Sequence, residues 1–123
     1  MQQQREQARQ NARAGADLED AVRLAIGALP GVIVHRNPQM LATSRTGTPV
    51  RTGIGGVGAP DLVCEVRGAD GTYRALWLEC KSGGGVLSKD QRRWHEAAAR
   101  EGRHVVIVRS AQDAVDAVRR VAA

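Results

Sequence analysis

Apolar side chains recur at helical spacing near the start of the chain and predict its first helix. They are Leu18, Val22, Ala25, Ile26 and Leu29, which a helical period places on one face. Asp17 is a suitable N-cap for this helix, and Pro30 followed by Gly31 is a suitable end. The preceding residues 1–16 are rich in Gln and Arg without an apolar stripe, so we expect a flexible arm or a frayed helix there.

Four short apolar runs predict β-strands, because they are rich in β-branched or alternating apolar residues. The runs are residues 31–35, 61–66, 73–81 and 104–109. A further helix is expected over residues 88–101, and a last one begins at Ser110. The resulting order α-β-β-β-α-β-α predicts an α/β domain over residues 17–123, with a single mixed β-sheet flanked by helices.

The segment between the first two strands, residues 36–59, has neither a helical nor a strand period, and we expect a long functional or mobile loop. It includes residues 53–58 (GIGGVG), which match the dinucleotide-binding pattern G-x-G-x-x-G. That pattern needs a strand before it and a helix after it, whereas a strand follows here. We therefore predict no nucleotide cofactor and interpret the glycines as sites of close backbone approach.

Composition and charge narrow the class of partner. The chain has 123 residues, a size typical of one domain, and a formal net charge of +5, which suits a polyanion such as nucleic acid. An aromatic content of 2% argues against stacking platforms for single strands. No apolar run approaches the roughly 20 residues that cross a bilayer, so we expect an unexported, cytoplasmic protein. Cys64 and Cys80 are then expected to be buried, reduced thiols.

The hairpin formed by the second and third strands carries information on register. With a three-residue turn over residues 69–71, Leu62 faces Leu78 and Asp61 faces Glu79. A two-residue turn would instead set Leu62 opposite Glu79 and mix apolar with charged side chains on both faces of the hairpin. Because strand register follows the buried pattern, we expect the three-residue turn.

This register brings three charged side chains together. Glu79 and Lys81 are two residues apart on one strand and share a face, where they meet Asp61, while Cys80 points to the opposite face. Opposed carboxylates repel each other, and a Mg²⁺ or Mn²⁺ ion, which prefers oxygen ligands, would resolve the conflict. A surface ion pair is the alternative, but Lys81 is one of only two lysines in the chain, which favours a specific role.

Pro60-Asp61 followed by Glu79-Cys80-Lys81 resembles the PD-(D/E)XK nuclease signature. Residues 55–62 and 77–81, with Leu87, Ser88, Gln91, Trp94 and residues 105–110, resemble the VRR-NUC branch, the virus-type replication-repair nucleases, across residues 17–118. The resemblance implies a restriction-endonuclease-like core and a Mg²⁺-dependent DNA endonuclease. In small phage or bacterial members it implies a homodimer that acts on branched DNA, as a Holliday-junction resolvase does. The compartment would then be the cytoplasm of a bacterium or a phage-infected cell.

This hypothesis gives each site residue a role. The metal ligands would be Asp61, Glu79 and the backbone carbonyl of Cys80. Lys81 would orient the attacking water. The resemblance also assigns Glu19 to the metal site, directly or through water, whereas a first-turn acid favoured by the helix dipole is the alternative. It places Gln91 beside the lysine, although Ser88 and Gln91 also have the spacing of a capping box.

The remaining candidates are histidines and arginines. His95 follows Gln91 by one helical turn and is interpreted as a solvated histidine rather than a phosphate contact. Three arginines of the long segment, Arg36, Arg45 and Arg51, are expected to bind DNA phosphates, with a merely solvated loop as the alternative. The rival to the nuclease hypothesis is a non-catalytic DNA-binding or assembly module that retains the scaffold.

Overall fold

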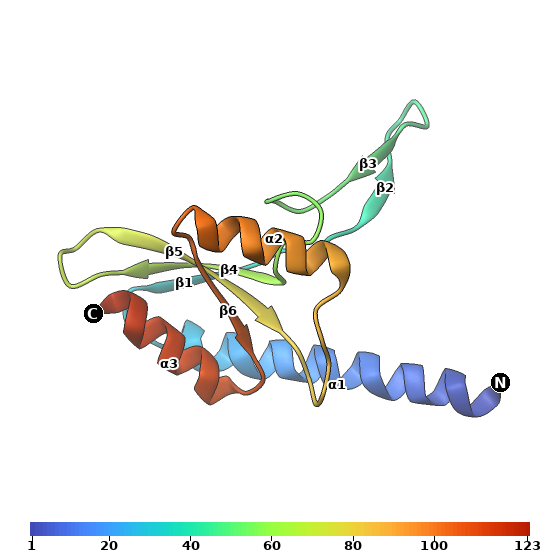
Figure 1. The fold of residues 1–123 in the computed structure, drawn as a ribbon, viewed down its shortest axis with the longest axis horizontal. Coiled ribbons are helices and arrows are strands. Elements are labelled where there is room, and N and C mark those ends of the chain that lie inside the picture. The colour runs from blue at the N-terminus through green and yellow to red at the C-terminus, as the bar shows by residue number, and fades with distance from the viewer.

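Four strands form one mixed sheet in the computed structural model, which describes residues 1–123. In spatial order they are β1 (Val32–Arg36), β4 (Leu62–Arg67), β5 (Tyr73–Cys80) and β6 (His104–Val108) (Figure 1). The pairs β1–β4 and β4–β5 are antiparallel, whereas β5–β6 is parallel. The α2 helix provides the crossover that a parallel pair requires. The predicted α/β class, with a mixed sheet flanked by helices, is confirmed.

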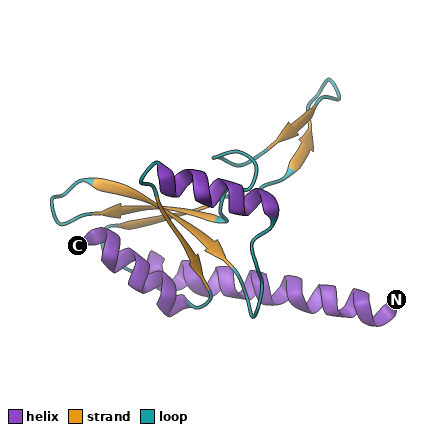
Figure 2. Cartoon of the chain, in the orientation of Figure 1, coloured by secondary structure: helices purple, strands orange, loops and turns teal.

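Helices cover both faces of this sheet (Figure 2). On one face, α1 (Gln2–Gly27) and α3 (Ala111–Ala122) enclose the main core, which includes the buried Val22, Ile26, Leu62 and Leu78. On the other face, α2 (Lys89–Arg100) packs Trp94 against Trp77, with ring centroids 4.8 Å apart. None of the three helices is long and apolar enough to cross a membrane.

The start of α1 differs from the prediction. The helix begins at Gln2 with Met1 as its N-cap, so Asp17 lies inside the helix and the expected cap there is wrong. The predicted apolar stripe nevertheless faces the core, because Val22 and Ile26 are fully buried. Packing of these buried turns against the sheet offsets the free-energy cost of helix nucleation. The preceding turns are rich in good helix formers such as Gln, Arg and Ala, so they continue the helix beyond the sheet (Figure 1).

The long segment contains a hairpin that its sequence pattern did not reveal. β2 (Leu41–Thr43) pairs antiparallel with β3 (Pro49–Arg51) in a separate two-stranded sheet. All six strand residues are exposed, so no face is buried and no apolar alternation marks them. The expectation of a long loop without strands over residues 36–59 was therefore wrong. The hairpin projects from the body between β1 and β4 (Figure 1).

The register of the β4–β5 hairpin is the one the apolar pattern predicts. Leu62 pairs with Leu78, and Cys64 pairs with Leu76. The turn is closed by the backbone N–H of Gly68, which donates to the carbonyl of Thr72 at 2.7 Å. Gly71 has a φ of 83°, the left-handed conformation that a glycine adopts readily. The three-residue turn is thus confirmed, and with it the burial of the leucine pair.

Residues 53–58 lead into β4 rather than into a helix. A Cβ on Gly55 would stand 3.2 Å from the ring of Trp77, and one on Gly58 would overlap the backbone carbonyl of Asp90. Trp94 closes the contact, because its indole N–H donates to the carbonyl of Gly55 at 2.7 Å. The glycines therefore permit close packing on β5 and α2, as their sequence context predicts.

Two glycine substitutions test this packing. Gly58 and Gly56 have nearly the same φ, 86° and 85°, but a Cβ at Gly56 would meet nothing within 4 Å. Gly56→Ala is expected to lower the unfolding free energy by about 1 kcal/mol, the cost of a left-handed alanine. Gly58→Ala is expected to lower it by at least twice as much, measured by urea denaturation. Equal losses in the two variants would show that contact with α2 contributes nothing.

Candidate active site

Asp61 stands directly before β4 and is held by its backbone and its side chain. Its carbonyl accepts a hydrogen bond from the backbone N–H of Asn37 at 2.7 Å. Its carboxylate Oδ2 accepts from the backbone N–H of Cys80 at 2.8 Å. Since the Leu62–Leu78 pair adjoins it, the register continues to Asp61 opposite Glu79. The two carboxylates thus meet at the end of the β4–β5 hairpin.

Asn37 fixes the approach to this position and was missed by the sequence analysis. Its side chain donates to the carbonyls of Ile54 and Pro60, both at 3.0 Å, and accepts from the N–H of Ile54 at 2.7 Å. Only 4% of the residue is exposed. Asn37 therefore ties the glycine-rich segment to the residue before Asp61. An Asn-Pro pair directly after a strand was the one local signal, and it indicates a turn more than a buried tether.

Glu79 is almost fully buried, with 1% exposure. The pKa of Glu79 is raised to about 9, mostly by burial and in addition by the hydrogen bond and the negative charge of Asp61, while the positive charge of Lys81 opposes this shift. Without a bound cation the Glu79 carboxyl is therefore protonated at neutral pH. The electrostatic conflict between Asp61 and Glu79 that the hairpin register predicts is present in the folded chain.

His95 is the second residue whose place sequence reasoning missed. Its side chain is 12% exposed and its Nε2 lies 3.8 Å from Oε1 of Glu79. Both atoms are buried without a hydrogen-bond partner. Burial lowers the pKa of His95, the charge of Lys81 lowers it further, and Asp61 opposes both effects. The interpretation of His95 as a solvated histidine is wrong, because α2 turns this side chain toward the sheet beside Trp94.

An open cleft of about 350 Å³ adjoins Asp61. Its charged and amide-bearing walls come from α1, β1, β3 and the start of α2, through the side chains of Glu19, Arg36, Arg51, Asp90 and Gln91. Glu79, Lys81 and His95 are not part of its lining. The cleft thus presents Asp61 at its surface, while the second carboxylate is buried next to it.

Glu19 and Gln91 both line this cleft, and the structure decides part of each alternative. Glu19 lies well inside α1, so the first-turn alternative is wrong, and its Oε1 accepts from Nε of Arg36 at 3.4 Å. The capping box of Ser88 and Gln91 is present, since Gln91 Oε1 accepts from the Ser88 N–H at 2.8 Å. The catalytic roles of Glu19 and Gln91 stay predictions.

The basic residues separate into two groups. Arg36 and Arg51 line the cleft, whereas Arg45 lies in the exposed tip of the β2–β3 hairpin and does not. Lys81 is half-buried and takes part in none of the six ion pairs. Its charge reaches both Glu79 and His95, whose pKa values it lowers. Lys81 is therefore not part of a surface ion pair.

The donor set fits a cation that prefers oxygen. Two carboxylates face each other, and Oε1 of Glu79 is buried without a partner. Burial raises the pKa of the Cys80 thiol to about 12, so no thiolate competes with the carboxylates for the metal. The prediction that Cys80 is fully buried is wrong, because the residue is half-buried. No three His, Cys, Asp or Glu side chains group around one point. Glu19 is therefore not a third direct ligand here, and further ligands would come from the backbone, water or substrate, as Mg²⁺ accepts.

Comparisons with known protein families, curated proteins and solved structures found no match. The resemblance to PD-(D/E)XK nucleases consequently rests on the residues of this chain alone. It stays a prediction.

The buried carboxyl makes the stability of the metal-free protein depend on pH. Between pH 4.5 and about 9 the folded chain retains a proton on Glu79 that the unfolded chain has lost. Stability therefore falls as pH rises through this interval, by at most about 1.4 kcal/mol per pH unit. Glu79→Gln removes this loss, so in EDTA it should gain stability relative to wild type from pH 5 to pH 8 in urea denaturation. The control is Glu96→Gln, an exposed change on α2; a Glu79→Gln curve parallel to wild type would refute the assignment.

His95 contributes to the burial of Glu79, and this contribution can be measured separately. His95→Ala should admit water to Oε1 and shift the Glu79 pKa toward its ordinary value. The decline in stability from pH 7 to pH 8 in EDTA, above the range in which His95 itself titrates, should then be shallower than in wild type. His104→Ala, at the exposed start of β6, is the matched control and should leave the slope unchanged. An unchanged slope in His95→Ala would mean that other groups exclude water from Glu79.

Proposed function

We propose that the chain is a metal-dependent endonuclease that hydrolyses phosphodiester bonds of cytoplasmic DNA. The observation that carries the proposal is the buried Glu79 carboxyl, forced against Asp61 next to a lysine without an ion pair, at an arginine-lined cleft. A protein gains nothing in stability from such a pair. Strongly shifted carboxyl pKa values beside a cleft are typical of functional sites.

Asp61, Glu79 and the backbone carbonyl of Cys80 are the residues that would hold a Mg²⁺ ion, with Mn²⁺ as a substitute. Bound there, the metal would lower the pKa of a water molecule and stabilise charge on the phosphoryl oxygens. The Lys81 ammonium would orient the attacking water and stabilise developing negative charge. His95 would keep bulk water away from Glu79, since it covers Oε1 without hydrogen bonding to it.

The cleft would bind the substrate backbone beside this centre. Arg36 and Arg51 line it and would contact phosphate oxygens, which fixes position without reading sequence. Glu19 holds Arg36 at 3.4 Å and would act on the metal site through water. Gln91, whose side-chain oxygen caps α2, would add its amide group at the cleft wall.

Branched DNA is the proposed substrate, and two copies of the chain would act together. A chain of this size has one such centre, so symmetric cutting of a four-way junction requires a homodimer. The rival function is a DNA-binding or assembly module without catalysis. Intact Asp61, Glu79 and Lys81 favour the enzyme, because a binding module has no need for a buried carboxyl pair.

Cleavage of a labelled four-way junction and of linear duplex, with Mg²⁺ or with EDTA, tests the proposal. Asp61→Asn should abolish cleavage and preserve DNA binding, because it removes metal charge but no phosphate contact. Lys81→Ala should slow cleavage by about 100-fold or more at unchanged metal affinity. Lys89→Ala, at the only other lysine, and Glu96→Gln are the controls and should cleave normally.

The outcomes distinguish the alternatives. No cleavage by wild type under any condition, with binding intact, would favour the non-catalytic module. Retained cleavage in Asp61→Asn would refute the site. Two nicks at symmetry-related positions, with a mass near twice 13.2 kDa by light scattering, support the dimeric junction nuclease. A monomer that cuts without preference for the junction would support a nuclease and refute the proposed junction-resolving activity.

A further inference from the structure

The formal net charge of the chain is concentrated in two segments that project from its body. Residues 1–16 contain three arginines and one glutamate, and residues 37–59, which follow β1, contain two arginines and no acidic residue. The rest of the chain has thirteen basic and twelve acidic side chains, so its formal charge is +1. Most of the +5 charge is thus carried by the free part of α1 and by the insertion that contains β2 and β3.

Both segments extend from the same end of the molecule (Figure 1). Each is also joined to the cleft. Glu19, in the first turns of α1 that meet the sheet, lines it, and so do Arg36 and Arg51 at the base of the insertion. The two basic segments therefore begin at the walls of the cleft and lead away from it.

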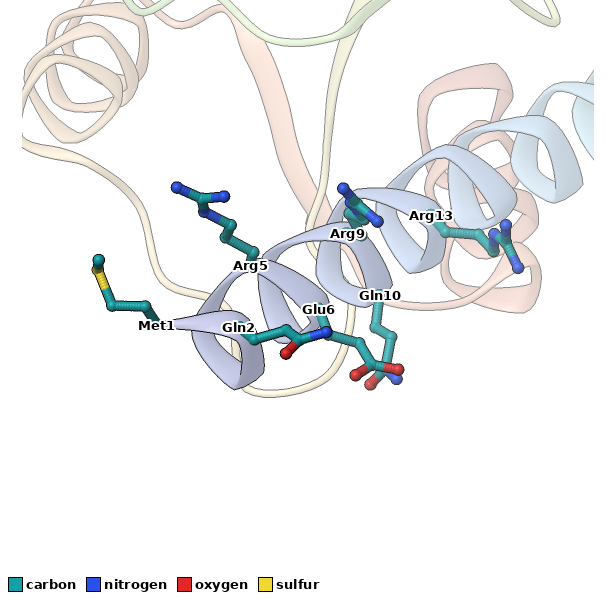
Figure 3. A pocket seen from close by; sticks show the side chains of 7 residues that line it. All are labelled: Met1, Gln2, Arg5, Glu6, Arg9, Gln10 and Arg13. Atoms are coloured by element: carbon teal, nitrogen blue, oxygen red, sulfur yellow. The ribbon is translucent and has the colours of Figure 1, made fainter.

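The free part of α1 presents a regular row of guanidinium groups. Arg5, Arg9 and Arg13 follow one another at four-residue intervals, about 6 Å apart along the helix axis. All three are exposed and belong to none of the ion pairs or side-chain hydrogen bonds of the chain. Figure 3 shows Arg5 and Arg9 extending from one side of the helix, with Gln10 on the other.

The row begins on the cleft side of α1 and turns away from it. At about 100° per residue, Arg5 lies about 40° around the helix from Glu19, Arg9 about 80° and Arg13 about 120°. Val22 and Ile26, which face the core, are on the far side of Glu19 from the row. Thus the core-facing stripe of the helix meets the sheet, Glu19 lines the cleft, and the arginine row starts near the direction of Glu19 on the side away from the core.

The composition of this arm selects its partner. Residues 2–16 have no apolar side chain larger than alanine, so they offer neither an anchor for a protein groove nor the apolar face of a membrane-binding helix. Evenly spaced guanidinium groups instead match a chain of phosphates, which arginine binds bidentately. A nucleic-acid backbone provides such a chain of charge, one phosphate per 3.4 Å of helix axis on each strand.

We propose that the free part of α1 binds the phosphate backbone of double-stranded DNA as it leaves the cleft, through Arg5, Arg9 and Arg13. With the β2–β3 hairpin it forms two basic arms at the end of the molecule where the cleft opens. This rests on the proposed function for the identity of the duplex as substrate. The arm supplies affinity and orientation, and it takes no part in the chemistry.

The test measures duplex binding by fluorescence anisotropy between 50 and 200 mM salt in EDTA, where no cleavage occurs. The triple variant R5Q/R9Q/R13Q keeps good helix formers, so circular dichroism should be unchanged. Loss of three phosphate contacts should reduce the slope of log K against log salt by about 2.7. Wild type should then lose about 40-fold more affinity than the variant over this range.

Two further variants complete the test. R5K/R9K/R13K keeps the charge and should retain most of the wild-type slope. R100Q/R119Q/R120Q removes the same charge from exposed positions of α2 and α3 and should retain it fully. A wild-type slope in R5Q/R9Q/R13Q, or an equal reduction of the slope in R100Q/R119Q/R120Q, would overturn the proposal that the free part of α1 binds DNA. Binding is measured without cleavage, so the two proposals can fail separately. If R5Q/R9Q/R13Q lowers the slope but the wild-type chain never cleaves DNA, DNA binding by α1 is supported and the nuclease function is refuted.

Discussion

The pairing of β4 with β5 in a single register is the constraint on which the candidate site depends. Leu62 and Leu78 face each other in the core, and the same register carries Asp61 against Glu79. Fully burying each leucine contributes about 1.5 to 3 kcal/mol. Keeping Glu79 protonated at pH 7 costs about 3 kcal/mol relative to its ordinary pKa of 4.5. The leucine pair outweighs the carboxyl conflict, so the core holds the two acids together.

The opposite face of the sheet makes this arrangement rigid. Asn37 tethers the segment before Asp61 with three side-chain hydrogen bonds, and the close approach of Gly55 and Gly58 seats that segment on Trp77 and α2. The glycine pattern that resembles a nucleotide-binding loop thus serves packing. Its backbone packs on Trp77 and α2 rather than on a ligand. The same close contact places α2, with His95, over Glu79.

Positive charge is distributed unevenly over the molecule, with most of the excess at one end. A body of formal charge +1 carries two basic segments at one end, with the cleft at their base. The exposed hairpin and the free part of α1 bury almost nothing and contribute little to the core. Segments with no part in the core are free to bind a partner, and an excess of guanidinium groups suits a polyanion.

Local periodicity by itself determined much of this protein. The two-residue period of the strands and the turn at Gly71 were enough to set the β4–β5 register, and with it the meeting of Asp61, Glu79 and Lys81. These features depend on neighbours in the chain, so the amino-acid sequence contains them. Likewise, the apolar stripe ending near Leu29 was enough to orient α1 on the sheet.

Only the tertiary structure decided the places of His95 and Asn37, the start of α1, and the β2–β3 hairpin. Trp94 is the only large apolar side chain of α2, so the polar side chains that accompany it inward depend on what the sheet offers. Asn37 finds its partners 17 and 23 residues away, where no local pattern reaches. The first turns of α1 and the hairpin bury no face. Because no side chain there has to face a core, no hydrophobic period in the sequence marks these elements. Their secondary structure depends on the packed parts of the chain to which they are joined.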